Sequence, residues 1–254
     1  MELQVLGCSG GVGNGLRTTT LMVDKDILID AGTGVGDLSL EQMAGIRHIF
    51  LTHSHLDHIA SIPLLVDSVF DQIHEPIVIH ALEQTIDALR RHIFNNVIWP
   101  DFAALPHPDR PVLRYEAMAP GEGLQLGNIN FEMVQVNHAV PGVGYVVQND
   151  RSVFAFSGDT TSNDTFWERL NRLDQLDMLI VEAAFPNRDI EICRRAGHYC
   201  PSLLAEDIAK LEHHPEIYIS HNKPGGESEI FAECSSSITG HSINRLSAGA
   251  RFAL

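Results

Sequence analysis

The chain has 254 residues, 44% of them hydrophobic, a length and composition that fit one large domain spanning 1–254 without cross-links. Its 33 acidic residues against 17 lysines and arginines give a formal net charge of −16, which disfavours nucleic acid as a partner. Without a run of about 18 apolar residues or a secretory leader, we expect a cytoplasmic protein that does not enter a membrane.

Short strands joined by glycines are expected at the start of the chain. Apolar stretches predict strands at 2–6, 19–23, 27–29 and 46–51, and the glycine-rich segment 7–15 is predicted to be a loop. The last of these strands runs directly into Thr52 and His53. Open α/β sheets carry their sites at the carboxyl ends of strands, so we expect a site here.

Two β-rich halves, each followed by helices and with no linker between them, are predicted for the rest of the chain. Helical spacing of apolar residues occurs at 59–70, 82–97, 163–173 and 202–213. Further strands are predicted at 77–79, 124–126, 129–136, 144–148, 152–156, 178–181 and 217–219. The proline-rich segment 99–111 is predicted to be a loop that could cover a cleft.

The segment Thr52-His53-Ser54-His55-Leu56-Asp57-His58 is the most informative one in the chain. Zinc prefers neutral imidazole and carboxylate ligands, and a tight turn can direct His53 and His55 one way and Asp57 and His58 another. A chance cluster is the alternative, since the chain has 14 histidines. Four ligand-type side chains within six positions at a strand end favour a site for two adjacent metals.

Two metals need further ligands, and three more candidates stand where apolar strands break into glycine or proline. They are His138, Asp159 and His221. Each alone is as easily an ordinary polar residue of a loop. Their common position at strand ends is what makes them candidates.

The ordered set of residues resembles the metallo-β-lactamase superfamily over almost the full chain. The matching residues are Asp30, His53, His55, Asp57, His58, His138, Asp159 and His221. The resemblance implies an α/β fold of four layers, αββα, with the metal site at strand ends between the two halves. It also implies two Zn²⁺ ions, or Mn²⁺ or iron in their place.

Residue roles follow from the same resemblance. One metal would be held by His53, His55 and His138, and the second by Asp57, His58 and His221. Asp159 would bridge the two metals, and Asp57 would also contribute to catalysis. Asp30 would orient the ligands without binding a metal itself. The alternative for Asp30 is an ordinary carboxylate in the turn at the end of a strand.

Within the superfamily, flanking segments resemble the class II cyclic-nucleotide phosphodiesterases. These segments are Leu6 to Gly11, Asp30 to Gly34, Phe156 to Trp167 and Val181 to Pro201. The sequence departs from that pattern in Tyr199-Cys200, where Leu-Ser or a similar pair is usual. The resemblance also places a phosphate-facing histidine at His198, which we expect to bind substrate and act as an acid or base; the alternative is a histidine at the start of a helix.

The resemblance implies a binuclear-metal hydrolase that opens a 3′,5′-cyclic nucleotide to the nucleoside 5′-monophosphate. A zinc-bridged hydroxide would attack phosphorus in line with the leaving ribose oxygen. Cyclic AMP is our first candidate substrate and cyclic GMP the second. The partner is thus a small molecule, and a homodimer is compatible with the sequence. Trp99, Phe102 and Phe185 are candidates to stack on the base, or else belong to the core.

Three other functions stay open from the sequence. A transfer-RNA 3′-processing endonuclease would need a cationic surface, but 59–137 holds ten acidic residues and only four arginines or lysines. A thioester or carbon–nitrogen hydrolase is disfavoured by the segment around His198. A non-catalytic metal-binding module would be expected to complete its metal coordination with protein ligands alone.

Overall fold

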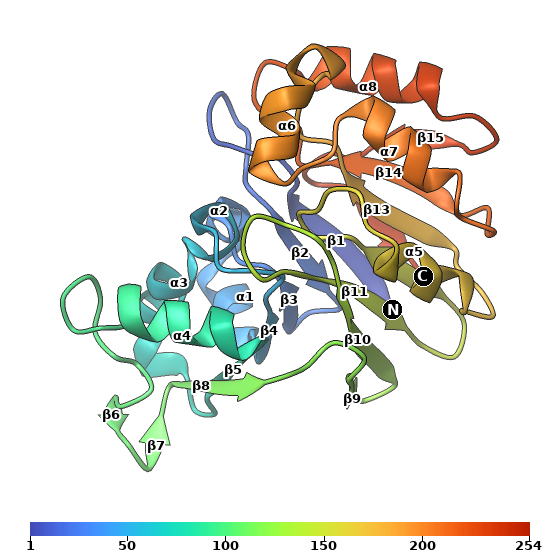
Figure 1. Cartoon of the computed structure of the whole chain (residues 1–254). Coiled ribbons are helices and arrows are strands. Elements are labelled where there is room, and N and C mark those ends of the chain that lie inside the picture. The colour runs from blue at the N-terminus through green and yellow to red at the C-terminus, as the bar shows by residue number, and fades with distance from the viewer.

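Two seven-stranded sheets face one another in the computed structural model, which describes residues 1–254 (Figure 1). In spatial order the first sheet contains β16 (Arg251–Ala253), β1 (Glu2–Gly7), β2 (Thr20–Val23), β3 (Ile27–Ile29), β4 (His48–Phe50), β5 (Ile77–Ala81) and β8 (Leu113–Ala117). The second contains β15 (Ile243–Arg245), β14 (Glu216–Ser220), β13 (Met178–Glu182), β12 (Val153–Phe156), β11 (Val143–Gln148), β10 (Ile129–Gln135) and β9 (Gly123–Leu126).

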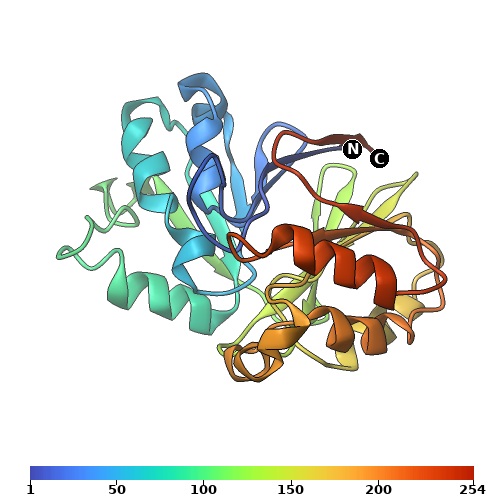
Figure 2. The same ribbon diagram turned by 90° about the horizontal axis from the view of Figure 1, so that it is seen from above.

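Helices cover the outer face of each sheet, as Figure 2 shows from above. The first half contributes α1 (Leu40–Gly45), α2 (Leu56–Ile59), α3 (Ile62–Ser68) and α4 (Glu83–His92). The second half contributes α5 (Thr165–Asn171), α6 (Ile190–Ala196), α7 (Pro201–Ile208) and α8 (Glu227–Ser237). The order of layers is therefore helix, sheet, sheet, helix, and the predicted αββα class is confirmed.

Three apolar clusters hold the layers together. The central cluster lies between the sheets and includes Phe50 and Phe131, whose rings stack with centroids 4.3 Å apart. The two outer clusters join each sheet to its own helices, with Ile62 in one and Trp167 in the other. A strand that is covered on both faces can be apolar throughout, which explains why β13 shows no alternation over Met178, Leu179, Ile180 and Val181.

The ends of the chain pair inside the fold rather than extending from it. β16 runs antiparallel to β1, and β15 runs parallel to β14. The sequence offered no functional interpretation of 232–254, and the structure assigns these residues to the end of α8 and to two edge strands. Because both termini lie in one sheet, we propose that residues 1–254 form a single domain.

Several predicted elements differ from the structure at their ends. The helix expected at 59–70 is interrupted between α2 and α3, since Pro63 in the first turn of α3 has no amide hydrogen to continue a helix. The helix expected at 82–97 ends at His92, before Asn96 adopts a left-handed backbone. The loop 99–111 contains a small hairpin of β6 (Pro106–His107) and β7 (Arg110–Pro111).

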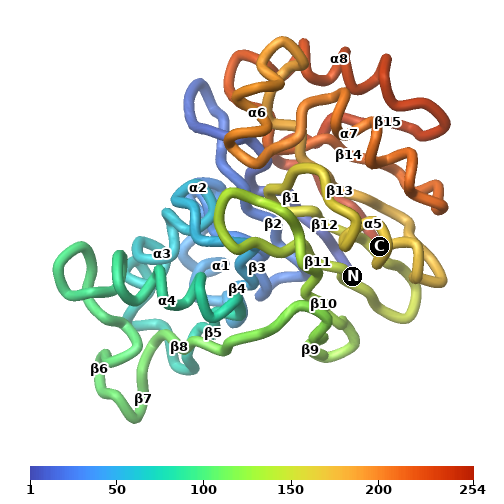
Figure 3. The backbone as a smooth tube through the Cα atoms, viewed as in Figure 1, coloured from blue at the N-terminus to red at the C-terminus, as the bar shows by residue number.

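Two hydrogen bonds tie the sheets together beside the metal-ligand motif. The Tyr145 hydroxyl on β11 donates to the Leu51 carbonyl oxygen at 2.8 Å, and the Val143 amide donates to the Thr52 carbonyl oxygen at 3.0 Å. These contacts hold the segment that follows β4 against the second sheet. Figure 3 shows the loops after β10 and β12 gathering near it, between α2 and α6.

Candidate metal centre

The His53 to His58 segment leaves the carboxyl end of β4 and turns into α2. His53 and His55 precede the helix, whereas Asp57 and His58 lie within its single turn. The helical turn directs the second pair away from the first. This local change of backbone explains how a six-residue segment can serve two separate positions.

Loops from the second sheet bring the remaining candidates to the same place. His138 follows β10, Asp159 follows β12 and His221 follows β14. The structure gathers the seven side chains into two groups that share Asp159: His53, His55, His138 and Asp159 form one, and Asp57, His58, Asp159 and His221 form the other. Within each group the ligand-type atoms all lie within 4.8 Å of one another.

Asp159 is the point where the two groups meet. Its Oδ2 atom lies 3.7 Å from His53 Nε2, 3.3 Å from His58 Nε2 and 3.2 Å from His221 Nε2. Two ligands on one tetrahedral zinc are about 3.3 Å apart, because each bond is close to 2.0–2.1 Å. The separations therefore suit a carboxylate that shares metal ions with these imidazoles.

Unpaired nitrogen atoms test whether the residues fit metal ions. The Nε2 atoms of His53, His58 and His221 are buried and have no hydrogen-bond partner. An unsatisfied buried polar atom costs about 1–3 kcal/mol, so three together need an explanation. Metal coordination supplies one, and the donor set of imidazole and carboxylate is the one that zinc, manganese or iron accepts.

In His58 and His138, the Nδ1 atom contacts a neighbouring residue, and this contact fixes the orientation of the ring. His58 Nδ1 lies 2.7 Å from Asp30 Oδ2, and His138 Nδ1 donates to the Gly197 carbonyl oxygen at 2.7 Å. Asp30 also accepts hydrogen bonds from the Thr52 amide and hydroxyl. Such partners are what metal-binding histidines have in proteins.

His55 faces the other ligand candidates of its group with Nδ1, whereas His53, His58 and His221 do so with Nε2. Its Nδ1 atom lies 3.1 Å from His138 Nε2. The two rings are nearly perpendicular, at 74°, with centroids 4.9 Å apart. This separation is close to the distance between two nitrogen ligands of one tetrahedral ion.

Burial controls the charge of these groups. It lowers the pKa of His53 and of His221 well below the usual value, and their cationic neighbours add to the effect. Burial also acts on His58, but the carboxylates of Asp159 and Asp30 overcome it and raise the pKa of His58. Although burial opposes ionisation of Asp159, His221 and His58 hold its pKa well below the usual range. Neutral His53 and His221 beside an ionised Asp159 are in the protonation states that metal binding requires, whereas His58 would have to release a proton when a metal binds.

Backbone strain is concentrated at two of these residues. Asp30 and His221 both adopt a left-handed backbone, with φ of 58° in each case. Non-glycine residues rarely do so, and such strain persists where surrounding contacts enforce it. Gly10 lies against His221, since a Cβ added to it would come 3.0 Å from the imidazole ring. The early glycine loop is therefore shaped to pack on this ligand candidate.

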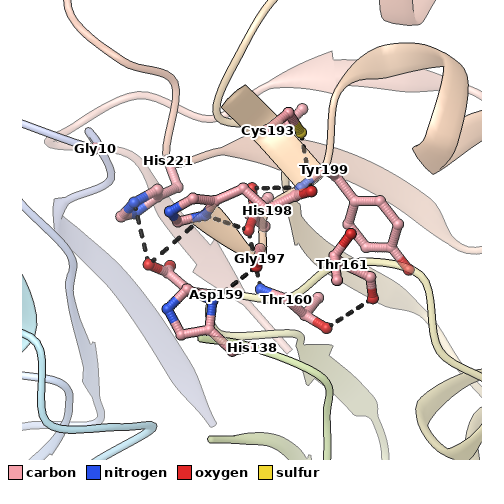
Figure 4. A network of polar contacts seen from close by, with 12 residues as sticks. Gly10, His138, Asp159, Thr160, Thr161, Cys193, Gly197, His198, Tyr199 and His221 are labelled. Carbon is pink, nitrogen blue, oxygen red and sulfur yellow. Dashed lines mark hydrogen bonds and ion pairs between the residues drawn. The ribbon is translucent and has the colours of Figure 1, made fainter. Parts of the chain in front are cut away.

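His198 lies beside the two groups but belongs to neither. Its Nδ1 atom is 2.7 Å from Glu182 Oε1 and 4.0 Å from Asp159 Oδ2. Its ring stacks on that of His221, with centroids 5.3 Å apart, and Figure 4 shows both rings turned toward Asp159. Burial lowers the pKa of His198, but Glu182 and Asp159 outweigh it and the pKa is raised.

Glu182 is a site residue that sequence reasoning did not single out. It ends the apolar strand β13, is fully buried, and accepts hydrogen bonds from the amides of Thr160 and Tyr199. Burial raises its pKa, and the nearby His198 partly offsets that effect. A lone glutamate that ends a run of Met-Leu-Ile-Val was the available signal, because a fully buried carboxylate needs a partner.

Of the three aromatic residues that were candidates to stack on the base, two pack in the hydrophobic core and one contacts the candidate site. Phe102 is 2% exposed and packs in the outer core of the first half, where Trp99 also packs against the same cluster. Phe185 instead contacts His198 edge-on, with ring centroids 5.8 Å apart. Of the three aromatic residues, Phe185 is the one whose ring contacts His198.

Comparison with known proteins places the chain in a family. The model of the beta-lactamase superfamily domain matches residues 25–221, and the chain belongs to this family. A probable 3′,5′-cyclic-nucleotide phosphodiesterase of Yersinia pestis is 27% identical over 274 residues, covering 88% of this chain and 78% of that protein. A ribonuclease Z of Halorubrum lacusprofundi is 31% identical over 160 residues, covering 59% of this chain and 49% of that protein.

A solved structure agrees with the fold. The structure of unliganded yeast PDE1 superimposes with a TM-score of 0.83 at 20% identity, covering 100% of this chain and 99% of that chain. The predicted resemblance to the metallo-β-lactamase superfamily is confirmed. The chain is thus a member of a hydrolase family whose fold implies divalent metals. No helix reaches the length and apolar character of a membrane span.

The shared carboxylate generates a prediction about metal content. Purified protein should hold close to two equivalents of zinc, manganese or iron. Asp159→Ala should lose both ions because the groups share this residue, whereas His221→Ala should weaken mainly one. Elemental analysis measures the outcome, with His92→Ala, an exposed histidine on α4, as the matched control. Full metal occupancy in Asp159→Ala would show that the bridge is misassigned.

Proposed function

We propose that the chain is a metal-dependent phosphodiesterase that hydrolyses 3′,5′-cyclic nucleotides to nucleoside 5′-monophosphates. The observation that carries this proposal is the pairing of His198 with buried Glu182 directly beside the two metal-ligand groups. Relatives named cyclic-nucleotide phosphodiesterase support the substrate class. Cyclic AMP is the first candidate and cyclic GMP the second.

The proposed ligand roles follow the two groups of side chains. His53, His55 and His138 would hold one metal, and Asp57, His58 and His221 the other, with Asp159 between them. Two divalent ions, when bound, supply Lewis-acid activation of water and of the phosphoryl group. Zinc is the first candidate, and manganese or iron would suit the same donors.

His198 is suited to protonate the leaving ribose oxygen. Its Nδ1 is occupied by Glu182, so Nε2 is the nitrogen left for a substrate. Because Glu182 and Asp159 favour the protonated imidazole, the ring can give a proton from Nε2 as the phosphorus–oxygen bond breaks. Glu182 positions the ring and does not itself touch the substrate.

A cytoplasmic location is part of this proposal. The four cysteines are free thiols, which fits a reducing compartment. A small anion is also a better substrate for this chain than a long polyanion, given the net charge of −16.

A ribonuclease Z activity is the second candidate, because several relatives carry that name. One substrate panel decides between them. Metal-loaded protein is offered cyclic AMP, cyclic GMP, bis(p-nitrophenyl) phosphate and a precursor transfer RNA, and products are resolved by chromatography. We expect 5′-monophosphate from a cyclic nucleotide. Efficient cleavage of the transfer RNA with no cyclic-nucleotide turnover would reverse the assignment.

The role of His198 gives a substrate-dependent prediction. His198→Ala should keep its metals yet lose roughly 10²- to 10⁴-fold in turnover of a cyclic nucleotide, the usual value of a positioned acid. The loss should shrink on bis(p-nitrophenyl) phosphate, whose leaving group departs without a proton. Turnover is measured on both substrates with metal content checked. An equal loss on both would indicate that His198 binds phosphate rather than protonating the leaving oxygen.

The charge of Glu182 gives a prediction about pH. A carboxylate beside a histidine raises the pKa of the imidazole, so Glu182→Gln should lower the pKa of His198. An acid works only while protonated, so activity should fall at lower pH in the variant than in the wild type. The pH profile of kcat measures this shift. Glu206→Gln, an exposed carboxylate on α7, is the control and should leave the profile unchanged.

A further inference from the structure

Tyr199 directly follows His198, and its side chain is fully buried. It is one of the two residues at which the sequence departs from the pattern it resembles, and the proposed hydrolysis does not use it. A buried phenol hydroxyl needs hydrogen-bond partners, whereas the ring alone would need only apolar neighbours. The partners of the hydroxyl therefore show what a tyrosine does at this position that another large apolar residue would not do.

Two helices of the second half hold the Tyr199 hydroxyl. Trp167 Nε1 on α5 donates to the hydroxyl oxygen at 3.2 Å, and the hydroxyl donates to Asp207 Oδ2 on α7. Asp207 is itself 3% exposed, and its Oδ1 atom lies 2.7 Å from Lys210 Nζ. Burial and the Asp207 carboxylate raise the pKa of Tyr199, so the hydroxyl stays protonated and keeps its role as a donor. Hydrogen bonds to ionised groups are among the stronger ones in proteins, so these contacts fix the position of the ring.

The backbone of Tyr199 contacts the residues that hold His198. Its amide donates to Glu182 Oε2 at 3.3 Å, and the other oxygen of the same carboxylate, Oε1, lies 2.7 Å from His198 Nδ1. Its carbonyl oxygen accepts a hydrogen bond from the Ala184 amide at 2.9 Å. Figure 4 shows the rings of His198 and Tyr199 extending in opposite directions from the chain. Tyr199 is thus fixed at its ring and contacts, through its amide, the carboxylate that holds His198.

We propose that Tyr199 is a positioning residue, whose anchored ring keeps its amide on Glu182 and thereby sets the direction in which Glu182 holds His198. This inference rests on the proposed function, in which His198 protonates the leaving oxygen. Proton transfer needs the imidazole to be aligned with that oxygen, and a displacement of about 1 Å can lower a rate by on the order of 10²-fold. Phenylalanine would fill the same space in the core, so the hydroxyl is the group that carries the role.

Turnover of Tyr199→Phe on two substrates tests the role of the hydroxyl. For a cyclic nucleotide, kcat should fall about tenfold while KM stays within about twofold and metal content is unchanged. The loss should shrink on bis(p-nitrophenyl) phosphate, whose leaving group needs no proton. Tyr218→Phe is the matched control, because the Tyr218 hydroxyl contacts only the exposed Glu216, and it should leave kcat unchanged. Wild-type kcat in Tyr199→Phe, or an equal loss on both substrates, would overturn the proposal.

A double variant tests whether Tyr199 acts through Glu182. In a Glu182→Gln background, Tyr199→Phe should lower kcat by less than about twofold, because residues of one hydrogen-bond network are not additive. A full tenfold loss in that background would contradict the proposal. If Tyr199→Phe does not fold, Asp207→Asn takes its place, since it keeps the size of the side chain and removes the charge that holds the hydroxyl. Wild-type kcat in Asp207→Asn would then overturn the proposal.

Proton NMR of the zinc-loaded protein tests the positioning without any turnover. The Nδ1 proton that His198 shares with Glu182 should give a far-downfield resonance, identified by its loss in His198→Ala. This resonance should shift or broaden in Tyr199→Phe and stay unchanged in Tyr218→Phe. If the wild type turned over no cyclic nucleotide, the proposed function would fail, and the resonance would still decide the role of Tyr199. An unchanged resonance in Tyr199→Phe would overturn that role.

Discussion

A buried carboxylate organises the centre of this protein. Asp159 has lost nearly all contact with water, and an isolated charge in that position would be costly. The imidazoles of His53, His58 and His221 surround its Oδ2 atom and come from both halves of the chain. The two β-sheets therefore meet around one electrostatic constraint, and Asp159 is the residue that the two groups of metal-ligating side chains share.

The surrounding structure serves to hold these side chains in place. Asp30 orients His58, the Gly197 carbonyl orients His138, and hydrogen bonds from β11 secure the segment after β4. The strained backbone of Asp30 and His221 fits the same description, since strain at a site is maintained by packing elsewhere. Glu182 contacts His198 Nδ1 and holds this ring at the edge of the two groups of metal-ligating side chains.

Sequence reasoning predicted the parts of the site that depend on local pattern. The dense ligand motif follows β4 of the first sheet, and the later candidates follow β10, β12 and β14 of the second sheet; their side chains converge where the ends of these strands meet. Glu182 was missed because an apolar strand that ends in one glutamate looks like any core strand. The pairing of β16 with β1 joins residues about the full chain length apart, and no local signal encodes such contacts.

The central claim is that two metal ions lie side by side on a shared carboxylate, and the distance between them tests it most directly. X-ray absorption spectroscopy of the zinc-loaded protein should show imidazole ligands and a metal–metal separation of about 3.5–4 Å, as in other two-metal hydrolytic sites. The feature should vanish in Asp159→Ala. A spectrum from fully loaded protein with isolated metal ions and no such separation would contradict the account.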